Sequence, residues 1–132
     1  MPPLFKKLNL KDHAEMLVLN APASFEPVLQ ALDGVKIARS LAEVSSIGFA
    51  LAFAIRQTQV DALSADLVAR SLVDPVLWFA YPKGTSKKFT CDFNRDSGWA
   101  ALRSLGFDTV RQVAIDEDWS ALRFRRNEFI GG

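Results

Sequence analysis

The chain has 132 residues, a length that suits one domain of ordinary size, so we expect a single domain over residues 1–132. Hydrophobic residues make up 49% of the chain and charged residues 23%, which excludes an intrinsically disordered or fibrous protein. Sixteen Lys and Arg against fifteen Asp and Glu leave a net charge of +1. This near balance argues against a dedicated nucleic-acid-binding protein.

Cysteine, histidine and the hydrophobic runs narrow the class of protein further. The single cysteine, Cys91, excludes an internal disulfide framework and suits a reducing compartment, and the single histidine, His13, removes most histidine-dependent catalysis and metal binding. The first seven residues contain no apolar stretch of a secretory signal, and the longest apolar run, 47–55, is far shorter than the roughly 20 residues of a membrane helix. We therefore expect a cytoplasmic protein with no metal centre and no membrane contact.

Short apolar runs alternate with helix-like stretches over the first 106 residues. We predict four strands there, at residues 16–19, 35–38, 47–55 and 76–81. The run 47–55 is apolar on both faces, which is expected of a central strand that helices cover on each side.

Helices are predicted between these runs. Ser24, Thr58 and Asn94 each precede a helix-like stretch, and their side chains can accept hydrogen bonds from the N–H groups of a first helical turn. Asp92 and Asp96 flank the start of the third helix, where carboxylates favour the helix dipole.

The last two strands, 110–116 and 121–127, are joined by only four residues, which is too short a link for a crossover helix, so we predict an antiparallel hairpin. The full order, β-α-β-β-α-β-α-β-β, predicts a small α/β domain of the Rossmann-like, three-layer type with a mostly parallel sheet. Its closing hairpin is similar to the end of the methyltransferase fold, where the last strand inserts antiparallel beside its neighbour. This similarity supports the predicted fold but does not establish a reaction.

The determinants of a nucleotide site are missing from the sequence. In such a fold, glycines after the first strand let backbone N–H groups approach the cofactor, and an acidic residue after the second strand holds the ribose hydroxyls. Here the segment 20–24 contains no glycine, and Arg39 and Ser40 follow the second strand. We therefore expect no cofactor, and in particular no binding of S-adenosylmethionine or NAD.

A basic loop, residues 83–88, follows the fourth strand with the sequence Lys-Gly-Thr-Ser-Lys-Lys. It lacks the first glycine of a phosphate-binding loop, so it is either a solvated loop or an anion site. The second alternative stays open because ligands of parallel sheets bind beyond the carboxyl ends of the strands, and this loop leaves that edge. Lys87 and Lys88 are also close enough in sequence to Cys91 to lower its pKa, if they approach it in space.

Two segments resemble a known bacterial family. Residues 77–83 read Leu-Trp-Phe-Ala-Tyr-Pro-Lys, and residues 115–124 read Ile-Asp-Glu-Asp-Trp-Ser-Ala-Leu-Arg-Phe. They resemble the signature segments of a domain-of-unknown-function family of short stand-alone proteins, and residues 6–10 and 17–22 look like the start of that family. The resemblance implies a bacterial α/β protein and assigns no reaction.

The second of these segments, residues 115–124, admits two interpretations. In the first, Asp116 pairs with Arg123 across the hairpin and Trp119 folds over the sheet edge, so that the motif only locks the hairpin. In the second, Trp119, Ser120 and Arg123 line one wall of a pocket that Lys83 completes.

We therefore predict a small-molecule or anion-binding module on a degenerate Rossmann-like scaffold. Its candidate ligand-binding residues are Lys83, Lys87, Arg95, Trp119, Ser120 and Arg123. Two alternatives stay open: a protein-interaction module that uses the C-terminal hairpin with its Arg123, Arg125 and Arg126, and a reduced methyltransferase-like enzyme. The expected partner is a small anionic ligand rather than nucleic acid, and the sequence leaves catalysis and homo-oligomerisation open.

Overall fold

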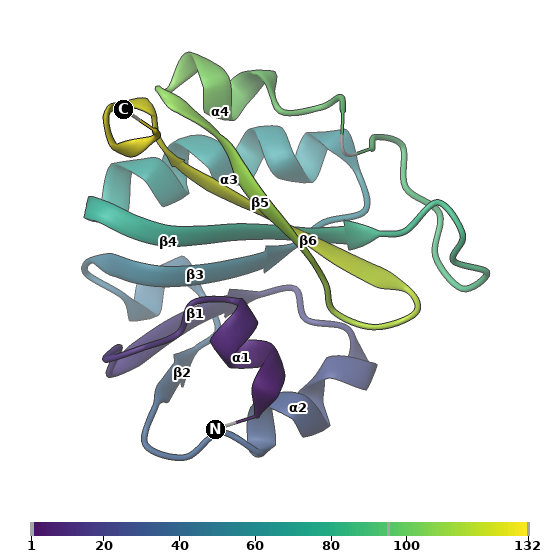
Figure 1. Ribbon diagram of the computed structural model, residues 1–132, viewed down its shortest axis with the longest axis horizontal. Helices are drawn as coiled ribbons and strands as arrows, with labels where there is room; N and C mark the ends of the chain where they lie inside the picture. Colours follow the sequence, from purple (N-terminus) through teal and green to yellow (C-terminus); the bar gives the residue numbers. More distant parts are fainter. Residues whose placement is uncertain (1, 95, 132) are drawn as a thin grey trace.

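The computed structural model describes residues 2–94 and 96–131 and shows one six-stranded sheet with helices on both faces (Figure 1). The strands are β1 (Glu15–Leu19), β2 (Lys36–Ala38), β3 (Ile47–Phe53), β4 (Ser71–Pro82), β5 (Phe107–Ala114) and β6 (Trp119–Arg126). The α-helices are α1 (Pro3–Lys7), α2 (Glu26–Gln30), α3 (Gln57–Arg70) and α4 (Ala100–Ser104). Short 3₁₀ turns are η1 (Ala23–Phe25), η2 (Leu41–Glu43) and η3 (Asn127–Phe129). None of the helices in the described ranges has the length and hydropathy to cross a bilayer.

The sheet is parallel except for its last strand. Its order is β2-β1-β3-β4-β6-β5, and β1 pairs in parallel with β2 and β3, as β3 does with β4. Strand β6 inserts between β4 and β5 and is antiparallel to both, with Phe79 opposite Leu122 and Val113 opposite Ala121. The prediction of a mostly parallel sheet with a C-terminal antiparallel hairpin is confirmed, and β5 becomes an edge strand.

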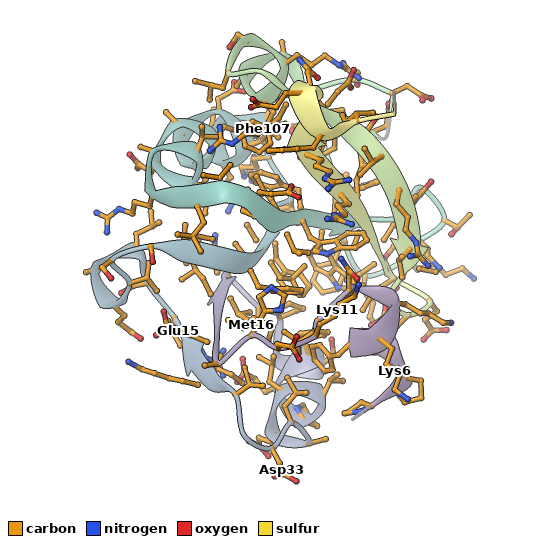
Figure 2. The ribbon with its side chains drawn as sticks, turned by 60° about the vertical axis from the view of Figure 1, so that its left-hand side comes forward. Lys6, Lys11, Glu15, Met16, Asp33 and Phe107 are labelled. Atoms are coloured by element: carbon orange, nitrogen blue, oxygen red, sulfur yellow. The ribbon has the colours of Figure 1, made fainter. Side chains whose placement is uncertain are left out.

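Two hydrophobic layers separate the sheet from its helices, so the three-layer architecture is also confirmed. On one face Val60 and Leu67 of α3 and Leu102 of α4 pack against the sheet. On the other face Phe5 of α1 and Leu29 of α2 do so. Figure 2 shows Met16 and Phe107, which are both fully buried, within the molecule, whereas Lys6 and Asp33 lie at its periphery.

Strand alternation assigns each residue of the hairpin to one of these layers. In β6, Leu122 and Phe124 belong to the α3 and α4 layer, and Ala121 belongs to the α1 and α2 layer. Because successive side chains of a strand point to opposite faces, Arg123 and Arg125 lie on the α1 side, away from the contact that buries Leu122 and Phe124.

The predicted helix caps are wrong. Helix α3 begins one residue before Thr58, and the side-chain oxygen of Gln59 accepts hydrogen bonds from the N–H groups of Ile55 and Arg56 at 2.8 and 3.1 Å. A 3₁₀ turn over Ala23–Phe25 precedes α2, so Ser24 lies inside that turn and does not cap the helix.

The predicted cap at Asn94 is wrong because of the loop that precedes α4. Helix α4 begins only at Ala100, and the Asn94 oxygen accepts from the N–H of Asp96 at 2.8 Å, which stabilises a turn within the loop. Asp92 does cap a helix, but a different one from that expected: its Oδ1 accepts from the N–H of Gln57 in the first turn of α3 at 2.6 Å. Side chains of this kind stabilise turns as readily as helix starts, and the tertiary position of the loop decides between them.

Candidate functional site

The loop between β4 and α4, described over residues 83–94 and 96–99, folds over the carboxyl end of β4 and frames an open cleft of about 750 Å³. We call this the polar cleft. Most of its lining comes from that loop, and the sheet contributes its floor from three strands: Tyr81 and Pro82 of β4, Gln112 of β5 and Ser120 of β6. The cleft therefore lies where a ligand of a parallel sheet is expected, beyond the carboxyl ends of the strands.

Hydrogen bonds fix this loop at both ends. On the hairpin side, the N–H of Lys83 donates to the carbonyl of Asp118 at 2.8 Å, and the Ser86 hydroxyl donates to the Asp118 carboxylate at 2.9 Å. On the α3 side, the Gln57 side chain donates to the carbonyl of Gly98 at 2.7 Å. Gly98 has a φ of +93°, a conformation that glycine adopts at little cost. The loop is thus tied to the hairpin and to α3.

Most of the side chains that line the polar cleft are uncharged hydrogen-bonding groups. The Gln112 side chain donates to the buried Tyr81 hydroxyl at 3.2 Å, and Ser120 is buried beside them. Lys83 is half-buried in the lining, and its ammonium makes no ion pair or hydrogen bond with any described residue. In contrast, the Lys88 ammonium lies 4.0 Å from the Asp118 carboxylate. Lys83 can therefore bind an external anion without first breaking an ion pair to the described part of the chain.

Cys91 also lines the polar cleft, but its thiol is not activated. Burial raises the pKa of the Cys91 thiol above its usual value. A hydrogen bond from the Phe93 backbone lowers this pKa in part, and the nearby Asp92 carboxylate raises it again. Lys87 and Lys88 are not among the groups that shift the pKa of Cys91, so their nearness in sequence does not lower it.

A second, smaller cavity of about 190 Å³ adjoins the polar cleft, and we call it the apolar hollow. Its lining includes Pro22 after β1, Phe53 of β3 and Trp119 of β6, and Phe89 belongs to the lining of both cavities. The Trp119 ring lies 5.2 Å from the Phe53 ring and 5.0 Å from the Phe89 ring, measured between centroids. Trp119 is 3% exposed, and its indole N–H has no partner among the described residues.

The structure distributes the predicted site residues over several places. Lys83 and Ser120 line the polar cleft, and Trp119 lines the apolar hollow because adjacent residues of a strand point to opposite faces. Lys87 lies on the same loop but is exposed and outside the lining. Arg95 lies outside the described residues.

Arg123 does not join the others. It lies opposite Trp78 on the α1 side of the sheet, and neither cavity includes it. It does not pair with Asp116 either, because the Asp116 carboxylate accepts hydrogen bonds from the N–H groups of Asp118 and Trp119, both at 2.8 Å, within the hairpin turn. Thus Trp119, Ser120 and Arg123 do not line one wall.

Phe89 and Gln112 line the cavities but were not singled out from the sequence. Phe89 belongs to the lining of both cavities, and the signal that could have found it is a large aromatic side chain in a mostly polar loop. Gln112 gave no comparable signal, because its place depends on how the register of β5 sets it beside Tyr81.

An ion pair joins Arg39, which follows β2, to Glu26 at the start of α2, in the region where such folds hold the ribose of a cofactor. The Arg39 guanidinium donates to both carboxylate oxygens of Glu26, at 2.8 and 2.7 Å. The turn after β1 contains Asn20 at a φ of +58°, followed by Ala21 and by Pro22, which has no N–H to offer. An acidic residue free to accept from ribose hydroxyls is therefore not found at the end of β2 in this structure.

No family model and no curated protein sequence matches this chain. Solved structures match its fold. A protein from Sulfolobus solfataricus, provisionally classed as a type 11 methyltransferase, gives a TM-score of 0.56 at 7% identity, over 100% of this chain and 92% of its own. The N-methyltransferase NodS from Bradyrhizobium japonicum WM9 gives a TM-score of 0.53 at 14% identity, over 93% of this chain and 92% of its own. At these identities the similarity establishes the methyltransferase fold and leaves the reaction undetermined.

Proposed function

We propose that this protein binds a small heteroaromatic acid, with the ring of the ligand in the apolar hollow and its acidic group in the polar cleft. The two cavities share Phe89, so a single ligand of modest size can extend from one into the other. Sites for small molecules combine this kind of apolar surface with a few placed polar groups.

The observation that carries the proposal is the unpartnered indole N–H of Trp119. A buried donor without an acceptor costs about 1–3 kcal/mol, so such groups are rare unless a ligand or water completes them. The surrounding Phe53 and Phe89 rings supply apolar surface for a flat group. A ring nitrogen or carbonyl on the ligand would accept from Trp119, which selects a heteroaromatic ring over a plain hydrocarbon.

Lys83 supports the acidic half of the ligand. Lys83 is half-buried in the lining of the cleft, and its ammonium is unpaired within the described ranges. Ser120 and Tyr81 line the same cleft and add neutral hydroxyl groups. A hydrogen bond to a charged group contributes about 1.5–3 kcal/mol. A carboxylate or a phosphate fits this arrangement better than a neutral polar group.

A methyltransferase-like activity is the second candidate, and the match to methyltransferase structures over nearly the whole of both chains favours it. The residues do not fit S-adenosylmethionine, however. The turn after β1 has no glycine, and Arg39, already bound to Glu26, stands where an acidic residue would hold the ribose. We therefore place binding of an organic acid ahead of methyl transfer.

Thermal melting with a panel of quinoline carboxylates tests the proposal. We expect at least one isomer to raise the melting temperature of the wild-type protein, because ligands that bind only the native state stabilise it. The Lys83→Ala variant should bind that isomer about tenfold more weakly or worse. The Lys87→Ala variant is the matched control, since it removes the same charge from the same loop outside the cleft.

Two results would overturn the proposal: no isomer stabilises the wild-type protein, or both lysine variants lose the stabilisation equally. Calorimetric titration with S-adenosylmethionine tests the second candidate separately, and we expect no measurable heat of binding. A micromolar affinity would favour the methyltransferase-like alternative.

A further inference from the structure

Two arginines face each other on the α1 side of the hairpin, away from both cavities. Arg111 of β5 and Arg123 of β6 are direct partners in the antiparallel register. A shift of register between Thr109 and Arg111 produces this alignment. Such bulges re-aim side chains and occur often beside functional sites.

Neither arginine has a protein partner within the described ranges. Asp74 is the acidic residue that influences Arg123, but its two carboxylate oxygens already accept from Nε and a terminal nitrogen of Arg125, at 3.0 and 2.7 Å. The Arg123 Nε atom is buried and makes no hydrogen bond there. Arg126 lies on the other face, where it donates to the Val73 carbonyl at 2.8 Å.

This arrangement is unfavourable without a further group. Like charges directly opposite each other in a sheet destabilise it, and a buried guanidinium N–H without an acceptor adds to that cost. Burial, with the neighbouring charges of Arg125 and Arg111, lowers the pKa of Arg123, which shows that its surroundings disfavour the positive charge. An anion between Arg111 and Arg123 would relieve each of these effects at once.

We propose that Arg111 and Arg123 bind a phosphate monoester on the α1-side face of the hairpin. Two guanidinium groups present forked donors that match the oxygens of a phosphate. Their two positive charges balance the charge of about −1.5 to −2 that a phosphate monoester carries at neutral pH, whereas a carboxylate would neutralise only one of them. This site is independent of the cleft and of the organic-acid proposal.

Nuclear magnetic resonance of the arginine side chains tests the site in the wild-type protein. The Nε–H resonance of Arg123, identified by its absence in Arg123→Lys, should shift and saturate as inorganic phosphate is added at constant ionic strength. Acetate should cause a smaller shift. No saturable shift of this resonance would contradict the proposal. If Arg123→Lys fails to fold, triple-resonance assignment of the wild-type protein identifies the same Nε–H, so the test does not depend on any variant.

Variants then assign the contribution of each residue. Arg111→Gln should weaken phosphate binding by about tenfold, the loss expected for one charged hydrogen-bonding partner. Arg56→Gln is the matched control, because Arg56 is exposed and lies on the other side of the molecule at the start of α3, and it should bind phosphate as the wild-type protein does. Lys83→Ala should also retain binding, and a loss there would assign the phosphate to the polar cleft and overturn this proposal.

The source of the phosphate is resolved by comparing phenyl phosphate with a phosphoserine peptide on the same Arg123 resonance. Tighter binding of the peptide supports a phosphorylated protein partner, and tighter binding of phenyl phosphate supports a small phosphorylated ligand. Binding of neither would contradict the proposed monoester.

Discussion

At the scale of single residues, two buried tryptophans differ in how their indole N–H is satisfied. Trp78 donates to the carbonyl of Leu8 at 2.8 Å, whereas Trp119 has no described acceptor. Replacing Trp78 by Phe leaves the buried Leu8 carbonyl unpaired, but replacing Trp119 by Phe removes an unpaired donor. We predict that Trp78→Phe lowers the free energy of unfolding by at least about 1 kcal/mol more than Trp119→Phe. Urea denaturation measures both losses, and an equal loss would mean that Trp119 is satisfied in the free protein.

Cys91 gives a second prediction at this scale. Burial raises the pKa of the Cys91 thiol above its usual value, so less thiolate is present near neutral pH than in a free thiol. We predict that iodoacetamide alkylates Cys91 more slowly at pH 8 than it alkylates the thiol of glutathione, and that the rate at Cys91 rises only at higher pH. A quinoline carboxylate that fills the cleft should slow alkylation further. A rate above that of glutathione would show that the lysines do activate this thiol.

At the scale of elements, the loop over residues 83–99 decides whether the cleft exists. Gly98 holds a positive φ, and a Cβ there would collide with the Gln57 side chain and lie 2.9 Å from the Phe93 Cβ. We predict that Gly98→Ala costs about 2 kcal/mol of stability and weakens ligand binding. Gly84→Ala is the control in the same loop, because its Cβ would meet nothing within 4 Å, and it should change stability by less than about 0.5 kcal/mol. Equal losses from both, measured by chemical denaturation, would contradict this role of Gly98.

The strands were easier to predict from the sequence than the helix starts. The apolar runs that became β1, β3 and β4 and the four-residue link of the hairpin carry their signal locally, and the structure confirms them. The predicted caps at Ser24, Thr58 and Asn94 were wrong. At α3, for example, Gln59 and Asp92 accept the hydrogen bonds that Thr58 was expected to accept, and these bonds form only in the folded structure. Asp92 reaches Gln57 across 35 positions of sequence, a distance that no local pattern reveals.

The candidate site was also predictable only in part, because most of its contacts depend on the folded structure and not on local sequence. One of the two interpretations of residues 115–124 placed Trp119, Ser120 and Arg123 on one wall of a pocket that Lys83 completes. Lys83 and Ser120 both line the polar cleft. Trp119 and Arg123 do not, because alternation along β6 puts them on the face opposite Ser120. The Arg111–Arg123 pair could not be foreseen, since it depends on the bulge in β5.

At the scale of the whole molecule, the balance of charges limits the partners. The chain has a net charge of +1, and Arg125 and Arg126 are already engaged with Asp74 and with backbone carbonyls. Nucleic-acid binding needs several basic residues that act together. We predict no gel shift with DNA or RNA at physiological salt. A salt-sensitive shift that disappears when Arg111 and Arg123 are replaced would favour the interaction module instead.

The fold itself leaves the function open, because a shared fold does not imply a shared reaction. Two features of this chain bear on its ligand: the polar cleft and the apolar hollow, which share Phe89, and the ion pair between Glu26 and Arg39 after β2. We therefore propose that one organic acid occupies the polar cleft and the apolar hollow together.

The indole N–H of Trp119 reports whether such a ligand enters the apolar hollow. Its nitrogen-15 resonance, identified with Trp119→Phe, is followed while the best quinoline carboxylate of the melting panel is added. We expect a saturable downfield shift of the Trp119 resonance, as its N–H gains an acceptor, and no comparable shift of Trp78, whose N–H is already bound to Leu8. Stabilisation of the protein by the ligand with no change in the Trp119 resonance would contradict the account.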